Sequence, residues 1–347
     1  MPRGRNNFDF LRLLAAGLVL ASHLYPLTGV KDDRLLAFVN SLGLGMVGIS
    51  IFFVISGYLV MQSWTRDPDP LRYAARRALR IYPGLVVVVL MTMFVLGPLV
   101  TSLPLLQYFQ QPLLLGYLNA LLLFPMPYVL PGVFANNPLP GAVNGSLWTL
   151  PYEVTMYLLL PLAALTRLKD SAVFWVGITA LLAFASTTYR GSATQAPTFL
   201  FMGAMEFCFL GAFFFYGVAV AKLQERMGSP RLSLAAVFLA LLTLTWQTEW
   251  SDLLRHLLLG YVVIAVGVRS TPWLSSASRH GDFSYGIYIY AFPVQQTLVH
   301  FGIGSGSVLL NLIYLLVITL VFAVLSWVLV ERRALLLKPS KPPPAEH

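Results

Sequence analysis

Long apolar segments alternate with short polar ones along nearly the whole chain. A membrane-spanning helix needs roughly 20 mostly apolar residues, and backbone polar groups in hydrocarbon must be satisfied internally, so such segments are expected to be helices. Ten segments fit this pattern: residues 8–27, 42–61, 81–101, 147–166, 171–187, 199–221, 232–247, 253–268, 283–301 and 308–330. The pattern predicts an all-α polytopic membrane protein with ten transmembrane helices.

The stretch between the third and fourth predicted helices has a different character. It lies in a region without any charged residue, from Ile81 to Tyr152, and it contains many prolines and glycines. Its apolar run at 113–124 is too short to span and lies between two prolines, which indicates a re-entrant or interfacial piece. Because irregular backbone is tolerated at membrane depth only in protein or beside water, we expect an external segment over a cavity.

Composition and charge agree with a membrane protein. Of the 347 residues, 57% are hydrophobic and 11% are charged, against about 25% charged in soluble domains. The net charge of +9 could suggest nucleic acid, but the basic residues lie in short loops between apolar segments, as the positive-inside rule requires. That rule predicts that both termini are cytoplasmic. We expect one membrane domain, 1–337, and a proline-rich disordered cytoplasmic tail, 338–347.

Ionisable side chains within the first helix are candidates for function, because such residues are costly in a membrane. Arg12 and His23 are eleven residues apart, which places them within about 20° of one helix face and about 16 Å apart along the axis. Asp9 lies close to the same face and could pair with Arg12. The alternative is that Arg12 reaches the cytoplasmic interface and His23 makes a polar contact near the outer end.

Five ordered motifs and a weaker sixth resemble the acyltransferase-3 family over nearly the whole chain. The segment DFLRLLAAGLVLASH contains an arginine and a histidine in the spacing of that family's first helix. The others are FFVISGYL, RRALRIYP, SLWTLPYEVTMY, FSYGIYIYAFP and the weaker LSWVLVER. Two positions depart from the pattern: Ala291 stands where many relatives have histidine, and Arg333 stands where proline often follows the last glutamate.

The resemblance implies transfer of an acyl group, most commonly acetyl, from cytoplasmic acyl-coenzyme A to a hydroxyl of a sugar. The expected acceptors are lipopolysaccharide O-antigen, exopolysaccharide or another cell-surface or lipid-linked glycan, and the expected location is a bacterial inner membrane. Acyl-coenzyme A is then a co-substrate, and neither a resident cofactor nor a metal is predicted. The remaining expected partners are the carbohydrate acceptor and membrane lipid.

Three predicted catalytic residues fit this chemistry. A neutral histidine can take the proton of an attacking hydroxyl, an effect of about 10²- to 10⁴-fold, and His23 is the predicted general base. Glu153 is predicted to support the resulting imidazolium, with Arg12 on the same helix face as the base. Alternatively, Glu153 only complements the dipole of its own helix.

Four arginines at cytoplasmic depth are predicted to bind the phosphates of coenzyme A, since guanidinium groups recognise phosphate in a bidentate manner. They are Arg72, Arg76, Arg77 and Arg80. The alternative is simple positive-inside anchoring. Trp148, Tyr285 and Tyr288 are candidates for stacking on sugar or adenine rings, although interfacial aromatic belts explain most such residues.

Two other functions remain open from the sequence. A transporter or flippase of a lipid-linked saccharide would use Arg12 and His23 to bind substrate or to relay protons. Dependence on coenzyme A would distinguish an acyltransferase from such a transporter. An acyltransferase with a small or lipid-like acceptor is also compatible. The acyl group could reach the acceptor directly, through a channel, or by way of an acyl-histidine.

Overall fold

The computed structural model describes residues 6–29, 41–166, 168, 170–190, 198–199, 201–245, 251–277, 279 and 281–339. Within them, helices account for almost all regular structure, and a two-residue antiparallel hairpin, β1 (Thr198–Phe199) with β2 (Met202–Gly203), is the exception. This confirms the prediction of an all-α membrane protein. The predicted disordered tail falls outside the described residues from position 340 onward.

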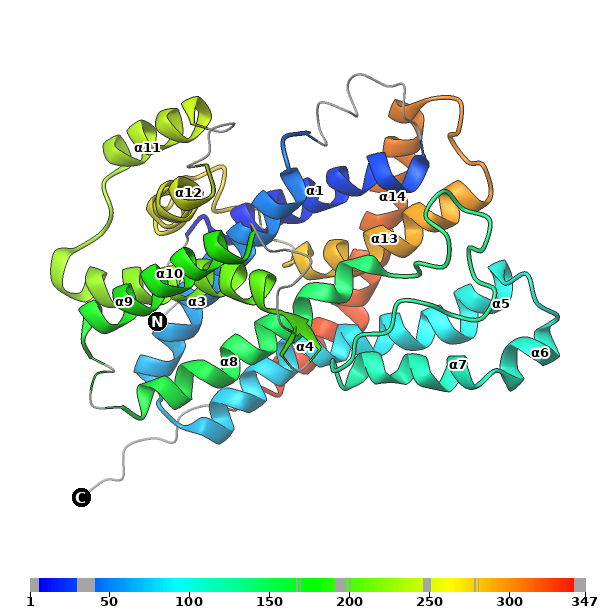
Figure 1. Ribbon diagram of the computed structural model, residues 1–347, viewed down its shortest axis with the longest axis horizontal. Coiled ribbons are helices and arrows are strands. Elements are labelled where there is room, and N and C mark those ends of the chain that lie inside the picture. The colour runs from blue at the N-terminus through cyan, green and yellow to red at the C-terminus, as the bar shows by residue number, and fades with distance from the viewer. Residues whose placement is uncertain are drawn as a thin grey trace.

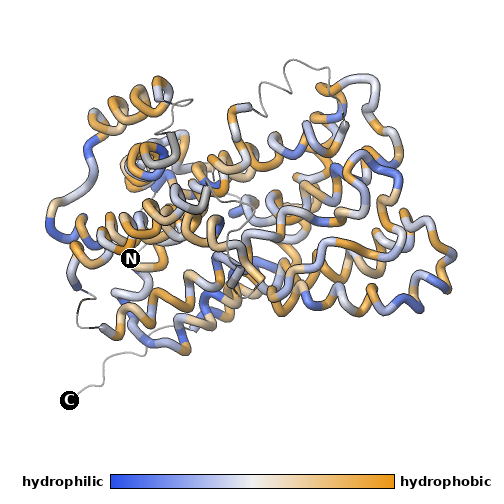
Figure 2. The backbone as a smooth tube through the Cα atoms, viewed as in Figure 1, coloured by the Kyte–Doolittle hydropathy of each residue, from blue (hydrophilic) through white to orange (hydrophobic). Residues whose placement is uncertain are grey.

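A helix is present at each of the ten predicted positions. They are α1 (Phe8–Thr28), α3 (Leu44–Arg66), α4 (Pro70–Met91), α8 (Leu150–Ala164), α9 (Ala172–Arg190), α10 (Ala204–Met227), α11 (Leu232–Leu244), α12 (Ser251–Gly267), α13 (Ser284–His300) and α14 (Val308–Ser326). Figure 2 shows hydrophobic residues along most of these helices.

The number of spans remains a prediction. Five helical stretches are long and apolar enough to cross a membrane: Phe8–Thr28, Leu44–Arg66, Pro70–Val100, Ala204–Met227 and Val308–Leu336. Others are shorter, and α11 with 13 residues extends only about 20 Å at 1.5 Å per residue. That is less than the roughly 30 Å of a hydrocarbon core.

The third helix begins eleven residues before its predicted start, because local signals favour an earlier beginning. Asp69 accepts a hydrogen bond from the backbone N–H of Arg72, and Pro70 occupies the first turn, where proline is favoured. The predicted cytoplasmic loop 62–80 is therefore mostly helical, and only residues 67–69 separate α3 from α4. The helix continues through a π-helical turn, η1 (Thr92–Leu96), into α5 (Gly97–Val100).

Helix α3 lies at the centre of the bundle and packs most closely against α10. The backbones meet at two glycines: a Cβ added at Gly57 would lie 1.9 Å from the carbonyl oxygen of Phe214, and one added at Gly217 would lie 2.1 Å from that of Val54. Such close approach through small residues is typical of helix packing in membranes. α3 also contacts α1, α8 and α12.

The segment that the sequence predicts to be external contains short helices in place of a span. After α5 come α6 (Leu105–Gln110), α7 (Pro112–Gly116) and the 3₁₀ turn η2 (Tyr117–Leu121), which lie together at one end of the molecule (right in Figure 1). The Tyr108 hydroxyl donates to the Met93 carbonyl, and the Asn137 amide donates to the Gln296 carbonyl at 2.9 Å. Polar side chains thus attach this segment to η1, which continues α4, and to α13.

The last helices of the chain are joined by a second π-helical turn. α14 continues through a second π-helical turn, η4 (Trp327–Glu331), into α15 (Arg332–Leu336). π-Turns inside helices occur frequently at functional sites. Buried Glu331 belongs to this turn and accepts a hydrogen bond from the Ser326 hydroxyl at 2.8 Å.

Candidate active site

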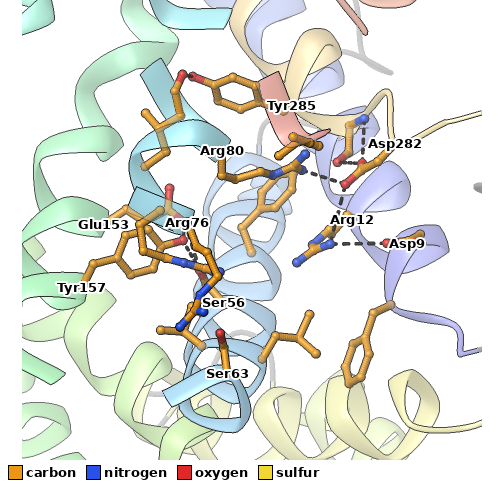
Figure 3. A pocket seen from close by; sticks show the side chains of 18 of the residues that line it. Asp9, Arg12, Ser56, Ser63, Arg76, Arg80, Glu153, Tyr157, Asp282 and Tyr285 are labelled. Carbon is orange, nitrogen blue, oxygen red and sulfur yellow. Dashed lines mark hydrogen bonds and ion pairs between the residues drawn. The ribbon is translucent and has the colours of Figure 1, made fainter. Parts of the chain in front are cut away.

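A pocket of about 840 Å³ opens among α1, α3, α4, α8 and α13 (Figure 3). Its lining combines basic side chains, carboxylates and tyrosines. They include Asp9, Arg12, Ser56, Asp67, Arg76, Arg77, Arg80, Glu153, Tyr157, Asp282, Tyr285 and Tyr288. The fold therefore brings together residues from five of the motifs that are far apart in the sequence.

Asp282 connects the first helix to the arginine-rich one. Its Oδ2 atom lies 2.7 Å from Nη2 of Arg80 and 3.6 Å from Nη1 of Arg12. Arg12 also pairs with Asp9 at 3.3 Å, which confirms the predicted contact. Burial alone would raise the pKa of Asp282, but the charges of Arg80 and Arg12 and two hydrogen bonds from Ser284 lower it to about 2. Asp282 is therefore ionised at neutral pH.

A second carboxylate holds two more arginines at the short connection before α4. Asp67 is buried and receives Arg72 at 2.7 Å and Arg76 at 2.6 Å. Hydrogen bonds from Arg72 and then Arg76 lower the pKa of Asp67 well below its usual range. Arg72 is not among the residues that line the pocket, whereas Arg76 is.

Arg77 differs from its neighbours. Its guanidinium carbon lies 5.8 Å from the ring centroid of Tyr157, a cation–π distance, and it lines the pocket. In the described part of the chain, no carboxylate lies within ion-pair distance of Arg77. This arginine thus presents a positive charge that no acidic side chain there neutralises.

Glu153 lies in this pocket with two hydroxyl groups. Its Oε1 atom accepts hydrogen bonds from Ser56 at 2.9 Å and from Tyr157 at 2.5 Å, and these two hydroxyls are 2.6 Å apart. Ser56 comes from α3, so this cluster joins α3 to α8. No hydrogen bond or ion pair joins Glu153 to His23 among the described residues.

His23 lies outside the lining of the pocket, farther along α1. It is half-buried, its ring packs edge-on against Phe292 with centroids 5.1 Å apart, and its Nδ1 atom is buried. Within the described residues this atom has no hydrogen-bond partner. The structure therefore places Arg12 at the pocket and His23 beyond it, on the same helix.

Of the three aromatic candidates, two line the pocket and one does not. Tyr285 and Tyr288 line the pocket, and the Tyr285 ring lies 5.8 Å from the guanidinium carbon of Arg80. Trp148 instead packs edge-on against Tyr152 and is not among the lining residues.

Sequence reasoning missed Asp67 and Asp282 as partners of the arginines, and Ser56 and Tyr157 as partners of Glu153. Asp282 had a signal, since it immediately precedes the motif FSYGIYIYAFP, whereas Asp67 lies nine residues before RRALRIYP. For Ser56, nothing in the pattern distinguishes it from the small residues that pack helices.

A comparison with known protein families identifies the family of this chain. The model of the acyltransferase domain that defines the acyltransferase-3 family matches residues 5–331. The chain belongs to the acyltransferase-3 family. Membership makes this protein a membrane-embedded acyltransferase, and it accounts for the motifs that meet at the pocket.

Two curated relatives align with this chain over almost their whole length. A protein of Shigella phage Sf6, named O-acetyl transferase, is 29% identical over 337 residues, which cover 95% of this chain and 96% of the relative. Nodulation protein 10 of Rhizobium leguminosarum bv. viciae is 31% identical over 364 residues, covering 97% of this chain and 95% of the relative. No solved structure matches the chain significantly.

Proposed function

We propose that the protein transfers an acetyl group from cytoplasmic acetyl-coenzyme A to a hydroxyl of a cell-surface or lipid-linked sugar, such as lipopolysaccharide O-antigen or exopolysaccharide. Family membership and the name of the phage relative support acyl transfer. The observation that supports acyl-coenzyme A as the donor is the pocket, where Arg76, Arg77 and Arg80 lie on consecutive turns of α4.

The pocket suits a ligand with several phosphate groups. Guanidinium groups bind phosphate oxygens in a bidentate manner, and Arg77 has no competing carboxylate among the described residues. Phosphates would compete with Asp67 for Arg76 and with Asp282 for Arg80. By the positive-inside rule, this end of the molecule faces the cytoplasm, where acyl-coenzyme A is made, and the protein lies in the inner membrane with both termini cytoplasmic.

His23 is the proposed general base. Its Nδ1 atom has no partner in the described structure, so a ring nitrogen is available to an acceptor hydroxyl. The hydroxyl oxygen attacks the thioester carbonyl while His23 takes its proton. The carbon–sulfur bond then breaks, an oxygen ester forms, and coenzyme A leaves as a thiolate that regains a proton. Arg12 and Glu153 contribute from the pocket, where each is held by hydrogen bonds or ion pairs.

Two measurements test this function. Mass spectrometry of the surface glycan, with and without the protein, is expected to show an acetyl group that depends on it. Complementation with His23→Ala is then expected to lower acetylation at least about 10²-fold, because that much is lost with a general base. His300→Ala is the matched control, since His300 is exposed at the far end of α13. Near-normal acetylation by a well-expressed His23→Ala variant would contradict the role of His23.

A further inference from the structure

Three buried polar atoms without hydrogen-bond partners lie around one turn of α13. They are Nδ1 of His23, Oδ1 of Asn144 and Oγ of Ser146, and no partner for any of them is found within the described residues. Asn144 and Ser146 are each 1% exposed. A buried polar atom left without a partner is costly, so several in one place indicate that a ligand completes them.

The ring of Phe292 connects these atoms. It packs against His23 on one side, and a Cβ added at Gly145 would lie only 2.6 Å from its edge. Gly145 thus lets the 144–146 segment approach α13 closely. The Nδ2 atom of Asn144 donates to the Ile289 carbonyl at 2.9 Å, which fixes the amide so that Oδ1 is the free atom.

Tyr288 links this segment to the basic pocket. It lies one turn before Phe292 on α13, and it lines the pocket. Its hydroxyl donates to the Ser146 carbonyl at 2.7 Å and lies 2.6 Å from Oγ1 of Thr149, another lining residue. The 144–146 segment therefore lies between the pocket and His23, on the way that the acyl end of a donor must take.

We propose that Asn144 and Ser146 bind an amide group of the pantetheine arm of the acyl donor. This assignment rests on the proposed use of acyl-coenzyme A. A secondary amide has one N–H donor and one carbonyl acceptor, and the segment offers one free acceptor, Asn144 Oδ1, and one free donor, the Ser146 hydroxyl. The nucleotide end, in contrast, carries the charges that suit the arginines.

Ser146→Ala tests the assignment cleanly, because the lost hydroxyl makes no hydrogen bond within the described structure. The binding of coenzyme A and of adenosine 3′,5′-bisphosphate, a nucleotide fragment without the arm, is measured on the purified protein. Coenzyme A is expected to bind about 3- to 10-fold more weakly to the variant, the loss typical of one neutral hydrogen bond, with nucleotide binding unchanged. Thr319→Val is the control, since Thr319 Oγ1 is also buried without a partner but lies on α14, outside the pocket lining.

Four outcomes would overturn the assignment. They are unchanged coenzyme A binding by Ser146→Ala, equal weakening of both ligands, an equal loss in the Thr319→Val control, and a raised KM for the sugar acceptor with an unchanged donor KM. Failure of the proposed function gives a different result, because wild-type protein would then bind neither coenzyme A nor the nucleotide fragment. That result would refute both the use of acyl-coenzyme A as donor and the proposed amide-binding site.

Discussion

Replacing Asp282 with asparagine probes the connection between α1 and α4. The substitution keeps the shape of the side chain but removes the charge that Arg80 and Arg12 share. Asparagine also turns one oxygen into an NH₂ group, which cannot accept from a guanidinium. Arg80 and Arg12 are then left close together with less negative charge between them.

The size of the effect follows from the contacts that are lost. The hydrogen bond from Arg80 is 2.7 Å long, and the side chains of Arg80 and Asp282 are 21% and 14% exposed. A charge-assisted hydrogen bond of this kind contributes about 1.5–3 kcal/mol. The contact with Arg12, at 3.6 Å, is too long for a hydrogen bond and is counted as a weak ion pair, which adds at most about 1 kcal/mol. The variant is expected to be less stable by roughly 1.5–4 kcal/mol.

Equilibrium unfolding in mixed detergent micelles measures this difference, with Asp170→Asn as the control. Asp170 is 75% exposed and lies 3.6 Å from Lys222, so its substitution is expected to cost less than about 1 kcal/mol. A loss below about 0.5 kcal/mol for Asp282→Asn would refute the reasoning, since surface substitutions fall in that range.

The same contact predicts a dependence on pH. The pKa of Asp282 is lowered from 3.8 to about 2, so its stabilising effect is complete above the unfolded value and is lost as pH falls toward 2. The difference between wild type and Asp282→Asn is therefore expected to be constant from pH 5 to 8 and to shrink below about pH 4.

Two further predictions concern the donor site and the topology. In correctly inserted enzyme, Arg76→Gln/Arg80→Gln is expected to raise the KM for acetyl-coenzyme A with little change in the KM for the acceptor. The control Arg226→Gln, at an exposed position, is expected to leave both KM values unchanged. An unaltered donor KM would mean that Arg76 and Arg80 only anchor the loop at the membrane surface. In a Cys208→Ser background, Asn136→Cys is expected to react with impermeant thiol reagents from outside the cell, and labelling only from the cytoplasm would contradict the predicted orientation.

The sequence was sufficient to locate the helices but not all of their ends. Apolar runs predicted a helix at each of the ten positions, because composition alone decides which segments can enter a membrane. The start of α4 was missed because its first turns carry four arginines, and a hydropathy pattern stops where charge begins. The N-cap Asp69 and Pro70 contained the missing information.

The site was predictable in its residue types and less so in its partners. Motif resemblance found Arg12, Glu153 and the arginines of RRALRIYP, and the structure gathers them at one pocket, whereas Arg72 lies outside its lining. Glu153 is predicted to support the imidazolium of His23, and its hydrogen bonds in the structure are with Ser56 and Tyr157, two partners that the sequence did not indicate. Such pairings depend on how helices pack and rotate against one another, and a single sequence carries no direct record of this.

The backbone contact between α3 and α10 affects how variants of this protein should be interpreted. Gly217 is not part of the pocket lining, yet any side chain there would meet the carbonyl of Val54, two residues before Ser56. A larger residue at 217 would push α3 away and displace the serine that holds Glu153. Loss of activity on substitution of Gly217 would therefore reflect displacement of α3 and of Ser56 in the pocket. It should not be taken as evidence for a second functional site.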